Sequence, residues 1–478
     1  MTRPIIEEIE SPSSAEEIFR ALKDRESVFF LDSASCHEKL GRFSFLGCDP
    51  FLVFKSKRDS ITLEWRDGKV ENFNSSPFSA LKDLLKLYKM EHDPALPFRS
   101  GMVGYFAYDL KDFIEDLPDK AYDDLNLPDC ILGFYDVVII HDNLKGKTYI
   151  SSSGFPETDP VKATLRRTER LEEFKETLSQ ASKRENISAK FYAEMPELRS
   201  NFSKEEYSEI IAKAKNYIKK GDIYQVNLSQ RFQAKVKVEP AELYLRLRDV
   251  SPAPFAAYLG FKDVAILSSS PERFLLKKGD YIETRPIKGT RPRGEDEIRD
   301  AFFKKQLIES SKDRAEHIMI VDLERNDLGK ICKYGSVLPS ETFVLEGYKN
   351  VFHLVSTVAG ELERGASPID CLFAAFPGGS ITGAPKIRSM EIIEELEPVK
   401  RSVYTGSIGY ISFDGDMDMS IVIRTLLVKE DNVYFQVGGG IVADSVPEEE
   451  YEETLHKARG LMEALGVNRT ILDTRCRK

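Results

Sequence analysis

A helix followed directly by a strand, between Ser203 and Phe232, constrains the fold of this chain most. Ser203 and Glu206 have the spacing of a capping box, apolar residues then recur with helical period, and Gly221 ends the pattern. From Ile223 to Phe232 apolar and polar residues alternate, which predicts a β-strand with one polar face. This face belongs either to an ordinary half-solvated strand or to a strand that lines a polar cavity.

Composition limits the class of protein. Of 478 residues, 41% are hydrophobic and 31% are charged, so the chain can bury a sizeable core. The net charge of −11 and the lack of a strong basic run argue against a nucleic-acid groove. No stretch reaches the roughly 18 apolar residues of a membrane span, and six cysteines without a C-x-x-C pair are typical of reduced thiols. We therefore expect a cytoplasmic protein that binds neither nucleic acid nor membrane.

Shifts in composition predict three regions. Residues 1–160 contain short β-rich runs between Gly, Pro, Asn and Asp. Residues 161–200 are rich in Lys, Arg, Glu and Ser, which predicts a charged, exposed helix and a connector. Residues 201–468 contain the helix and strand described above, together with the segments that could carry chemistry. We expect the boundary between two large parts in the connector.

Two acidic pairs are candidates for metal binding. Asp313 and Glu316 are three residues apart in one predicted helix, and Glu450 and Glu453 are three apart in another, so each pair shares a helix face. If the two faces met, they would offer hard carboxylate oxygens to one Mg²⁺. On spacing alone, such pairs are far more often solvated surface.

A basic segment is the second candidate, because Arg285, Lys288, Arg291 and Arg293 fall within nine positions. If these cations stay close in space, like-charge repulsion favours the neutral amine of Lys288 and makes it a nucleophile. A solvated basic turn is the alternative, because the segment also contains Pro and Gly.

Nine segments together resemble the chorismate-utilising enzymes. The six stronger ones lie between Phe202 and Leu465 and are SSSPERF (268–274), PIKGTRPRG (286–294), DRAEHIMIVDLERNDLG (313–329), FPGGSITGAPKIRSMEIIEELEP (376–398), GSIGYISFDGDMDMSIVIRT (406–425) and GGGIVADSVPEEEYEETLHKA (438–458). The weaker ones are LDSA (31–34), RFSFLG (42–47) and GMVGYFAYD (101–109). Within the family, component I of the aminodeoxychorismate synthases is most similar, and component I of the anthranilate synthases is the near relative.

The resemblance implies an α+β fold in which two large antiparallel sheets pack face to face, with helices outside and an active-site cleft on the C-terminal part. It also implies Mg²⁺ as the cofactor that holds the ring carboxylate of chorismate. Glu316 and Glu453 match the direct Mg²⁺ ligands, and Asp313 and Glu450 match residues behind ordered waters.

Two residues match the family's reacting groups. Glu272 matches a general acid that helps the ring hydroxyl leave, and a carboxyl in such a cleft should have a raised pKa. Lys288 matches a lysine that attacks the ring and is then displaced by ammonia. Because anthranilate synthases typically have alanine there, Lys288 favours aminodeoxychorismate, the precursor of p-aminobenzoate for folate, as the product. Another protein would have to form p-aminobenzoate itself.

Further residues match substrate-binding positions of the family. Gln225 stands where water-using relatives carry a lysine base, which favours ammonia as the entering group. Tyr404 and Arg424 match positions that hold substrate carboxylates. The remaining candidates are Thr290, His353, Gly438, Gly439, Gly440 and Lys457.

The expected partners are chorismate, ammonia and a separate glutamine amidotransferase subunit in a heterodimer. The sequence has no G-x-C-x-G glutaminase nucleophile, so a second subunit should supply the ammonia. Part of the N-terminal region resembles the family's tryptophan site, with Leu31, Asp32, Ser33 and Arg42 as candidates. A catalytically silent tryptophan-binding subunit is therefore an alternative, although the intact acidic and lysine positions favour an enzyme.

Overall fold

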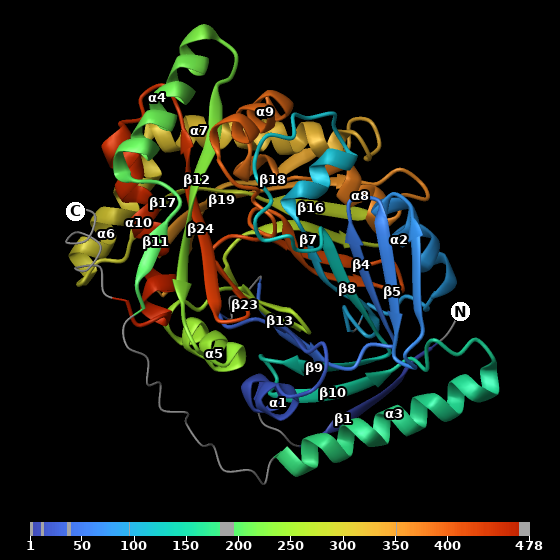
Figure 1. Ribbon diagram of the computed structural model, residues 1–478. Helices are drawn as coiled ribbons and strands as arrows, with labels where there is room; N and C mark the ends of the chain where they lie inside the picture. Colours follow the sequence, from blue (N-terminus) through green and yellow to red (C-terminus); the bar gives the residue numbers. More distant parts are fainter. Residues whose placement is uncertain are drawn as a thin grey trace.

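Two twelve-stranded sheets form the centre of the computed structural model, and helices cover their outer faces (Figure 1). Neighbouring strands run antiparallel in both sheets. These sheets confirm the predicted α+β fold. The structure describes residues 3–10, 14–35, 40–94, 96–181, 196–349 and 351–467.

The first sheet has one continuous path of strands and a short strand, β20, that pairs with β12. In spatial order its strands are β1 (Ile5–Ile9), β10 (Lys147–Ser152), β9 (Val137–Asp142), β3 (Phe43–Gly47), β2 (Phe29–Asp32), β13 (Phe255–Phe261), β14 (Val264–Ser270), β23 (Thr425–Lys429), β24 (Asn432–Ile441), β12 (Gln225–Lys235) and β11 (Leu198–Ser200), with β20 (Gly383–Ala384) beside β12.

The second sheet has the same plan, with β18 attached to β19. Its strands are β17 (Ile287–Pro292), β19 (Val351–Glu361), β16 (Tyr281–Arg285), β15 (Arg273–Lys278), β22 (Met417–Ile421), β21 (Ser407–Ser412), β7 (Gly101–Phe106), β8 (Cys130–Tyr135), β4 (Leu52–Lys57), β5 (Ser60–Trp65) and β6 (Val70–Asn74), with β18 (Leu338–Gly347) beside β19.

Both sheets combine strands from the two large parts of the chain. In the first sheet β2 pairs with β13, and in the second β7 pairs with β21. The connector expected at residues 161–200 therefore separates the parts along the chain, but neither sheet divides there.

Aromatic and aliphatic side chains from both sheets fill the space between them. Phe45 of β3 packs edge-on against Tyr410 of β21, with ring centroids 5.5 Å apart, and Phe98 stacks on the same tyrosine at 4.4 Å. Val103 of β7 and Ile266 of β14 belong to the same buried cluster. This cluster holds the sheets face to face.

Helices pack on the outer faces of the sheets. They are α1 (Ala15–Leu22), α2 (Pro77–Leu87), α3 (Pro160–Ala181), α4 (Lys204–Lys220), α5 (Pro240–Val250), α6 (Glu297–Glu309), α7 (Ser311–Gly329), α8 (Pro368–Ala375), α9 (Lys386–Leu396) and α10 (Pro447–Ala464), with the 3₁₀ turns η1 (Tyr108–Phe113) and η2 (Gly379–Ile381). No helix within the described ranges is long and apolar enough to cross a membrane.

The helix and strand predicted between Ser203 and Phe232 are confirmed as α4 and β12. Ser203 and Glu206 form the capping box, and Gly221 ends α4 with a φ of 84°. Val226 and Leu228 of β12 lie in the helix-covered core, while Gln225 points to the opposite, polar face and is also buried. Ser229 and Arg231 on the same face are buried as well, whereas Gln233 toward the end of the strand is exposed.

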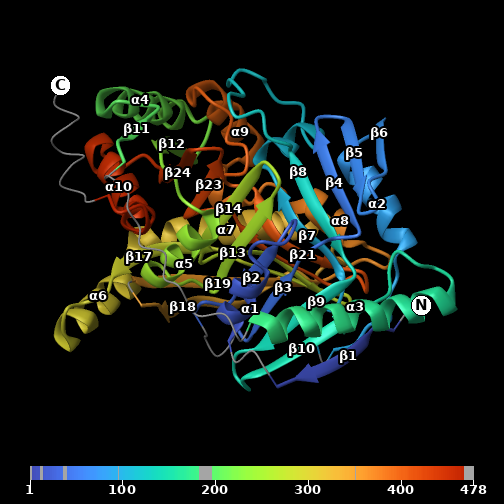
Figure 2. The ribbon, with the colours of Figure 1, turned by 60° about the horizontal axis from the view of Figure 1, so that its bottom comes forward.

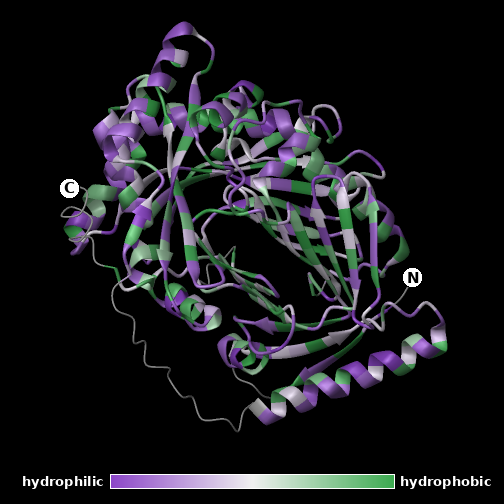
Figure 3. Cartoon of the chain, viewed as in Figure 1, coloured by the Kyte–Doolittle hydropathy of each residue, from purple (hydrophilic) through white to green (hydrophobic). Residues whose placement is uncertain are grey.

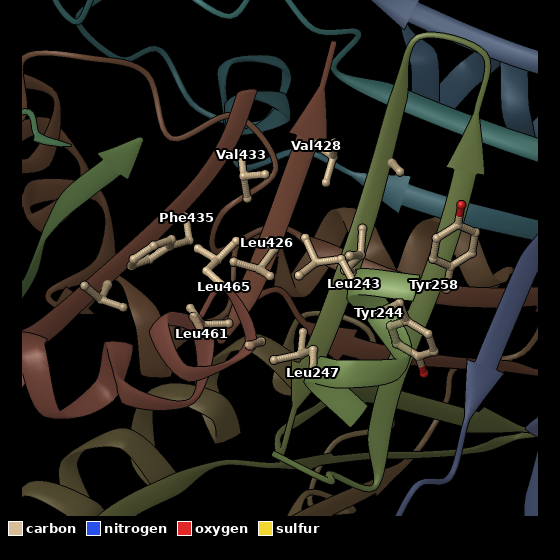
Figure 4. Packing of buried hydrophobic residues seen from close by; sticks show 14 of the residues in the cluster. Leu243, Tyr244, Leu247, Tyr258, Leu426, Val428, Val433, Phe435, Leu461 and Leu465 are labelled. Carbon is tan, nitrogen blue, oxygen red and sulfur yellow. The ribbon is translucent and has the colours of Figure 1, made fainter. Parts of the chain in front are cut away.

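One cluster of leucines joins α5 and α10 to the first sheet. Figure 4 shows Leu243 and Leu247 of α5 near Leu426 of β23, with Leu461 and Leu465 beside them. Each of these side chains is buried by at least 95%. Burying such side chains contributes roughly 1.5–3 kcal/mol each to stability, which holds the C-terminal end of α10 against β23 and α5.

The charged helix α3 lies along the outside of the first sheet (Figure 2). Its surface is largely hydrophilic (Figure 3), but Leu171, Phe174 and Leu178 are buried against the core beneath. Residues 182–195 of the expected connector lie outside the described residues.

Candidate active site

The candidate site lies where β12 and β24 meet α7, α10 and β17. Lys288 of β17 places its ammonium nitrogen 3.1 Å from Oε1 of Glu316 on α7, and Gln225 donates a hydrogen bond of 2.7 Å to the same oxygen. Burial alone would raise the pKa of Glu316, but these neighbours hold it below its usual value. Three predicted residues from three elements therefore meet here.

The second acidic pair lies on α10. Lys457 is 2.6 Å from Oε1 of Glu453 and also donates a 3.0 Å hydrogen bond to the main-chain oxygen of Gly438. The charge of Lys457 lowers the pKa of Glu453. Glu450 accepts a 2.6 Å hydrogen bond from Ser445, and burial raises its pKa.

Two adjacent glycines of β24 lie between the acidic pairs. A β-carbon on Gly439 would lie 3.3 Å from Oε2 of Glu450 and 3.6 Å from Oε1 of Glu453. On Gly440 it would lie 3.2 Å from Oε1 of Glu316 and only 2.0 Å from Nε2 of Gln225. Gly440 is therefore required for the close approach of Gln225 to the strand. The predicted meeting of α7 and α10 is thus found at these glycines.

The basic segment forms an edge strand rather than a free turn, and its arginines have carboxylate partners. Arg291 pairs with Asp313 at 2.8 Å and Arg293 pairs with Asp300 at 2.8 Å. Arg285, which is buried, pairs with Glu346 at 2.7 Å. Since each arginine has a carboxylate partner, the expected repulsion between unneutralised arginines and Lys288 is wrong. Spacing along the chain could not show these partners.

Glu272 lies between β14 and β15 and is 5% exposed. Ser380 of η2 donates a 2.6 Å hydrogen bond to its Oε1. Burial raises the pKa of Glu272 to about 7, against the opposing effects of Ser380, Lys288 and Arg424. A carboxyl with this pKa can hold a proton near neutral pH and donate it.

Arg424 lies near Glu272, and Tyr404 precedes Thr405, whose main-chain N–H donates a 2.8 Å hydrogen bond to Val422. Arg424 has a φ of 51°, and its guanidinium group forms no hydrogen bond or ion pair with the described residues; burial lowers its pKa, against the opposing charge of Glu272. Arg401 lies over the ring of Tyr404, 5.8 Å from its centroid. An unpaired guanidinium of this kind can bind a carboxylate in a bidentate manner.

Thr290 and His353 are neighbours on β17 and β19. Thr290 Oγ1 and His353 Nδ1 lie 2.9 Å apart. Burial lowers the pKa of His353 well below its usual value, so its ring is neutral. Its Nε2 and the Oε1 of Gln225 are buried without a hydrogen-bond partner among the described residues. Buried polar atoms usually have partners, so both are available to a ligand.

The tryptophan-site candidates lie together at β2 and β3. Asp32 is buried, with Arg248 at 2.6 Å and the hydroxyl of Tyr244 at 3.1 Å. Ser33 donates a 2.8 Å hydrogen bond to the main-chain oxygen of Phe43. Leu31 contacts the core between the sheets, and Arg42 pairs with Asp142 at 2.8 Å.

All four predicted metal ligands carry carboxylate oxygens, the ligand type that a hard cation such as Mg²⁺ prefers. Glu316 and Glu453 each direct an oxygen toward a lysine ammonium group, so both oxygens already face positive charge. Among the described residues, the one set of three ligand atoms within 4.8 Å is elsewhere, at His92, Asp414 and Asp416. Asp414 there already pairs with Arg99 at 3.0 Å.

Sequence reasoning missed two buried residues beside Glu272. Ser380 is its hydrogen-bond donor, and Glu324 of α7 binds the turn that carries Ser380. Both fall within segments that carry the family resemblance, FPGGSITGAPK and DLERNDLG. Their contacts join segments far apart along the chain, so only the structure shows what these two residues touch.

The fold and the site define an enzyme that combines a buried acid, a lysine and a group of carboxylates suited to a divalent cation. The chain belongs to the chorismate binding enzyme family, which matches residues 27–463.

Known proteins of this family are similar over nearly the whole chain. Anthranilate synthase component 1 of Aquifex aeolicus is 42% identical, covering 97% of this chain and 94% of that protein. Aminodeoxychorismate synthase component 1 of Bacillus subtilis is 39% identical, covering 89% of each. The crystal structure of anthranilate synthase component I from Streptococcus pneumoniae has a TM-score of 0.76 and 30% identity, covering 90% of this chain and 93% of that one.

Proposed function

We propose that this protein aminates chorismate with ammonia to form 4-amino-4-deoxychorismate, with Mg²⁺ as cofactor. The observation that carries the proposal is the position of Lys288, whose amine faces Glu316 and Gln225 inside the acidic site. In the resemblance described above, a lysine at this position distinguishes enzymes that make aminodeoxychorismate from those that make anthranilate.

The reaction takes two displacement steps. In the first, the lone pair of the Lys288 amine forms a bond to a ring carbon, the ring double bonds shift, and the C–O bond of the ring hydroxyl breaks. Glu272 gives its proton to the departing hydroxyl, which leaves as water. In the second, ammonia forms a C–N bond where the hydroxyl was, and the double bonds shift back. The bond to Lys288 breaks and returns its electron pair to the amine. The new ammonium group then gives a proton to Glu272.

Glu316 and Glu453 would hold Mg²⁺ directly, with Asp313 and Glu450 supporting it through water. Bound Mg²⁺ supplies the positive charge that holds the ring carboxylate of chorismate. Lys288 lies on an oxygen of Glu316, so its ammonium group would have to leave that oxygen for the carboxylate to hold the cation.

The remaining candidates bind and orient the substrate. The guanidinium group of Arg424 is unpaired among the described residues and can bind a carboxylate, and Tyr404 would act as a hydroxyl donor. The main-chain N–H groups of Gly438, Gly439 and Gly440 can approach the substrate closely because no side chain intervenes. Thr290 and neutral His353 lie on the neighbouring strands β17 and β19, and Nε2 of His353 is free to hydrogen-bond with the substrate.

Formation of anthranilate is the second candidate function, and the 42% identity to an anthranilate synthase component 1 favours it. The two functions share the acid, the carboxylates and ammonia, and differ in the carbon that receives the nitrogen. Incubation with chorismate, ammonium and Mg²⁺ tests the choice. Aminodeoxychorismate as the product supports the proposal, whereas anthranilate with pyruvate would establish the alternative.

Ammonia would come from a separate glutamine amidotransferase subunit. The name component 1 of the similar proteins supports a partner of this kind. The rigorously purified chain should use ammonium salts but not glutamine. Turnover with glutamine by the chain alone would contradict the need for a partner.

Tryptophan binding near β2 and β3 is a further part of the proposal. Asp32 and Arg42 lie within this region, each with an internal ion-pair partner. Equilibrium dialysis with labelled tryptophan, before and after a change of Ser33 to Trp, measures it directly. No retention of tryptophan by the unaltered chain would refute this part alone.

A further inference from the structure

Glu324 on α7 is a buried carboxyl that the proposed reaction does not use. It is 2% exposed. Its Oε1 accepts the main-chain N–H of Gly379 at 3.0 Å, and its Oε2 has no hydrogen-bond partner among the described residues. Burying a carboxyl group with one oxygen unpartnered costs folding free energy, so a role in the site would explain its presence.

Gly379 connects Glu324 to the proposed acid. A β-carbon on Gly379 would lie 2.7 Å from Cδ2 of Leu323 and 3.0 Å from Oε1 of Glu324, so α7 packs directly on the backbone of η2. The next residue, Ser380, donates its 2.6 Å hydrogen bond to Glu272. A contact path therefore leads from one buried carboxyl to the other through two consecutive residues.

The charged groups around the two carboxyls differ. Glu272 faces Lys288 and Arg424, whose positive charges favour its ionised form. Glu324 faces Asp327 and Glu272, whose negative charges oppose its ionisation.

The cations nearest Glu324 are already engaged. Lys386 also faces it, but this ammonium group forms an ion pair with Asp327 and hydrogen bonds to the main-chain oxygens of Ala375 at 2.9 Å and Pro377 at 2.7 Å. Lys330 likewise pairs with Asp327, at 3.0 Å. Glu324 therefore has no cation of its own among the described residues.

We propose that Glu324 is a positioning residue for Glu272: it fixes the turn that presents Ser380, and its negative charge opposes ionisation of the acid. The proposal rests on the proposed function of Glu272, but not on which product is formed.

The titration of the two groups agrees with this role. Burial raises the pKa of Glu324 to about 7, and the negative charges of Asp327 and Glu272 add to the rise. Burial also raises the pKa of Glu272 to about 7. Two nearby carboxyls that ionise in the same range titrate as a pair, so the presence of one charge delays the loss of the second proton.

Glu324→Gln tests the proposal, because glutamine keeps an oxygen for the N–H of Gly379 but cannot ionise. Glu272 should then lose its proton more easily. We expect the alkaline fall in kcat for chorismate consumption to move to lower pH by about half a unit or more, with KM unchanged. Free ammonia is held constant at each pH. Asp322→Asn is the matched control, since it removes an exposed charge from the same helix.

A pH profile of Glu324→Gln that coincides with that of Asp322→Asn would overturn the proposal. A fall in kcat that is equal at every pH would also overturn it, because a purely structural role predicts that result. Wild-type protein that consumes no chorismate would refute the proposed function, and this role with it. The two failures are therefore distinguishable.

Infrared spectroscopy provides a readout independent of turnover. The C=O stretch of protonated buried carboxyls should be present at pH 6 and weaken toward pH 8 as they ionise. One component should be missing in Glu324→Gln and retained in Asp322→Asn. An unchanged band in Glu324→Gln would contradict a protonated Glu324.

Discussion

The ammonium group of Lys288 lies 3.1 Å from Oε1 of Glu316, the same oxygen that accepts a hydrogen bond from Gln225. One carboxylate thus contacts both the proposed nucleophile and the residue that favours ammonia over water. The first step of the proposed reaction needs a neutral amine. Lys288 must therefore give up its ion pair with Glu316 before it can act as the nucleophile.

Loss of either predicted metal ligand should remove most of the Mg²⁺-dependent activity. Glu316→Gln and Glu453→Gln each take away a charged oxygen at a helix surface, so chorismate consumption should fall at least about tenfold while the melting temperature changes little. Rates measured across Mg²⁺ concentrations check this. Glu449→Gln, an exposed position on α10, is the control. Near-normal rates at ordinary Mg²⁺ would refute the ligand assignment.

Lys288→Ala should abolish the covalent intermediate. When ammonia is withheld, wild-type protein should accumulate an adduct with chorismate, visible as a mass increase on the peptide that contains Lys288. The variant should lack the adduct, make less aminodeoxychorismate and form more anthranilate, because ammonia then attacks the ring carbon that the lysine occupied. Lys278→Ala, an exposed change, should keep the adduct. Anthranilate from wild-type protein without any adduct would contradict the role of Lys288.

Gly440→Ala should disturb the site through size alone. The added carbon would lie 2.0 Å from Nε2 of Gln225, so this side chain must leave its position beside Glu316. We expect a loss of activity of at least about tenfold, comparable to the loss of a supporting residue at a metal site. Gly329→Ala, which meets no atom within 4 Å, is the control and should retain activity. Equal activities of the two variants would show that Gln225 has no such role.

The rate should fall as the pH rises through about 7, because Glu272 must be protonated to act and burial sets its pKa near that value. Ser380→Ala removes a hydrogen bond that stabilises the ionised form, so it should raise this pKa and move the fall to higher pH. This direction is opposite to that expected for Glu324→Gln. Profiles of kcat at constant free ammonia check both signs, and a shift of Ser380→Ala to lower pH would contradict the assignment.

Local signals in the sequence predict local structure well here. The capping box at Ser203 and the alternation after Ile223 correctly predict α4 and β12. The three-residue spacing correctly places Asp313 and Glu316 on one helix, because helical geometry depends only on neighbouring residues.

Contacts between distant segments could not be predicted in the same way. Arg285 pairs with Glu346, 61 residues away, and this pairing removes the unneutralised positive charge that the basic segment had indicated. Ser380 reaches Glu272 across 108 residues. Such pairs depend on strand order, which the spacing of residues does not determine. The candidate site residues came from the family resemblance, because periodicity alone does not connect distant segments.

The pairing of β2 with β13, and of β7 with β21, also has a consequence for how the chain folds during synthesis. Gly104 of β7 pairs with Gly409 of β21, so a ribosome must translate most of the chain before this pairing can form. Until then, the early strands have open edges that invite aggregation. Pairings of such long sequence separation also slow folding. A shortened chain that ends before β21 should therefore be a substrate for chaperones and proteases rather than a smaller working enzyme.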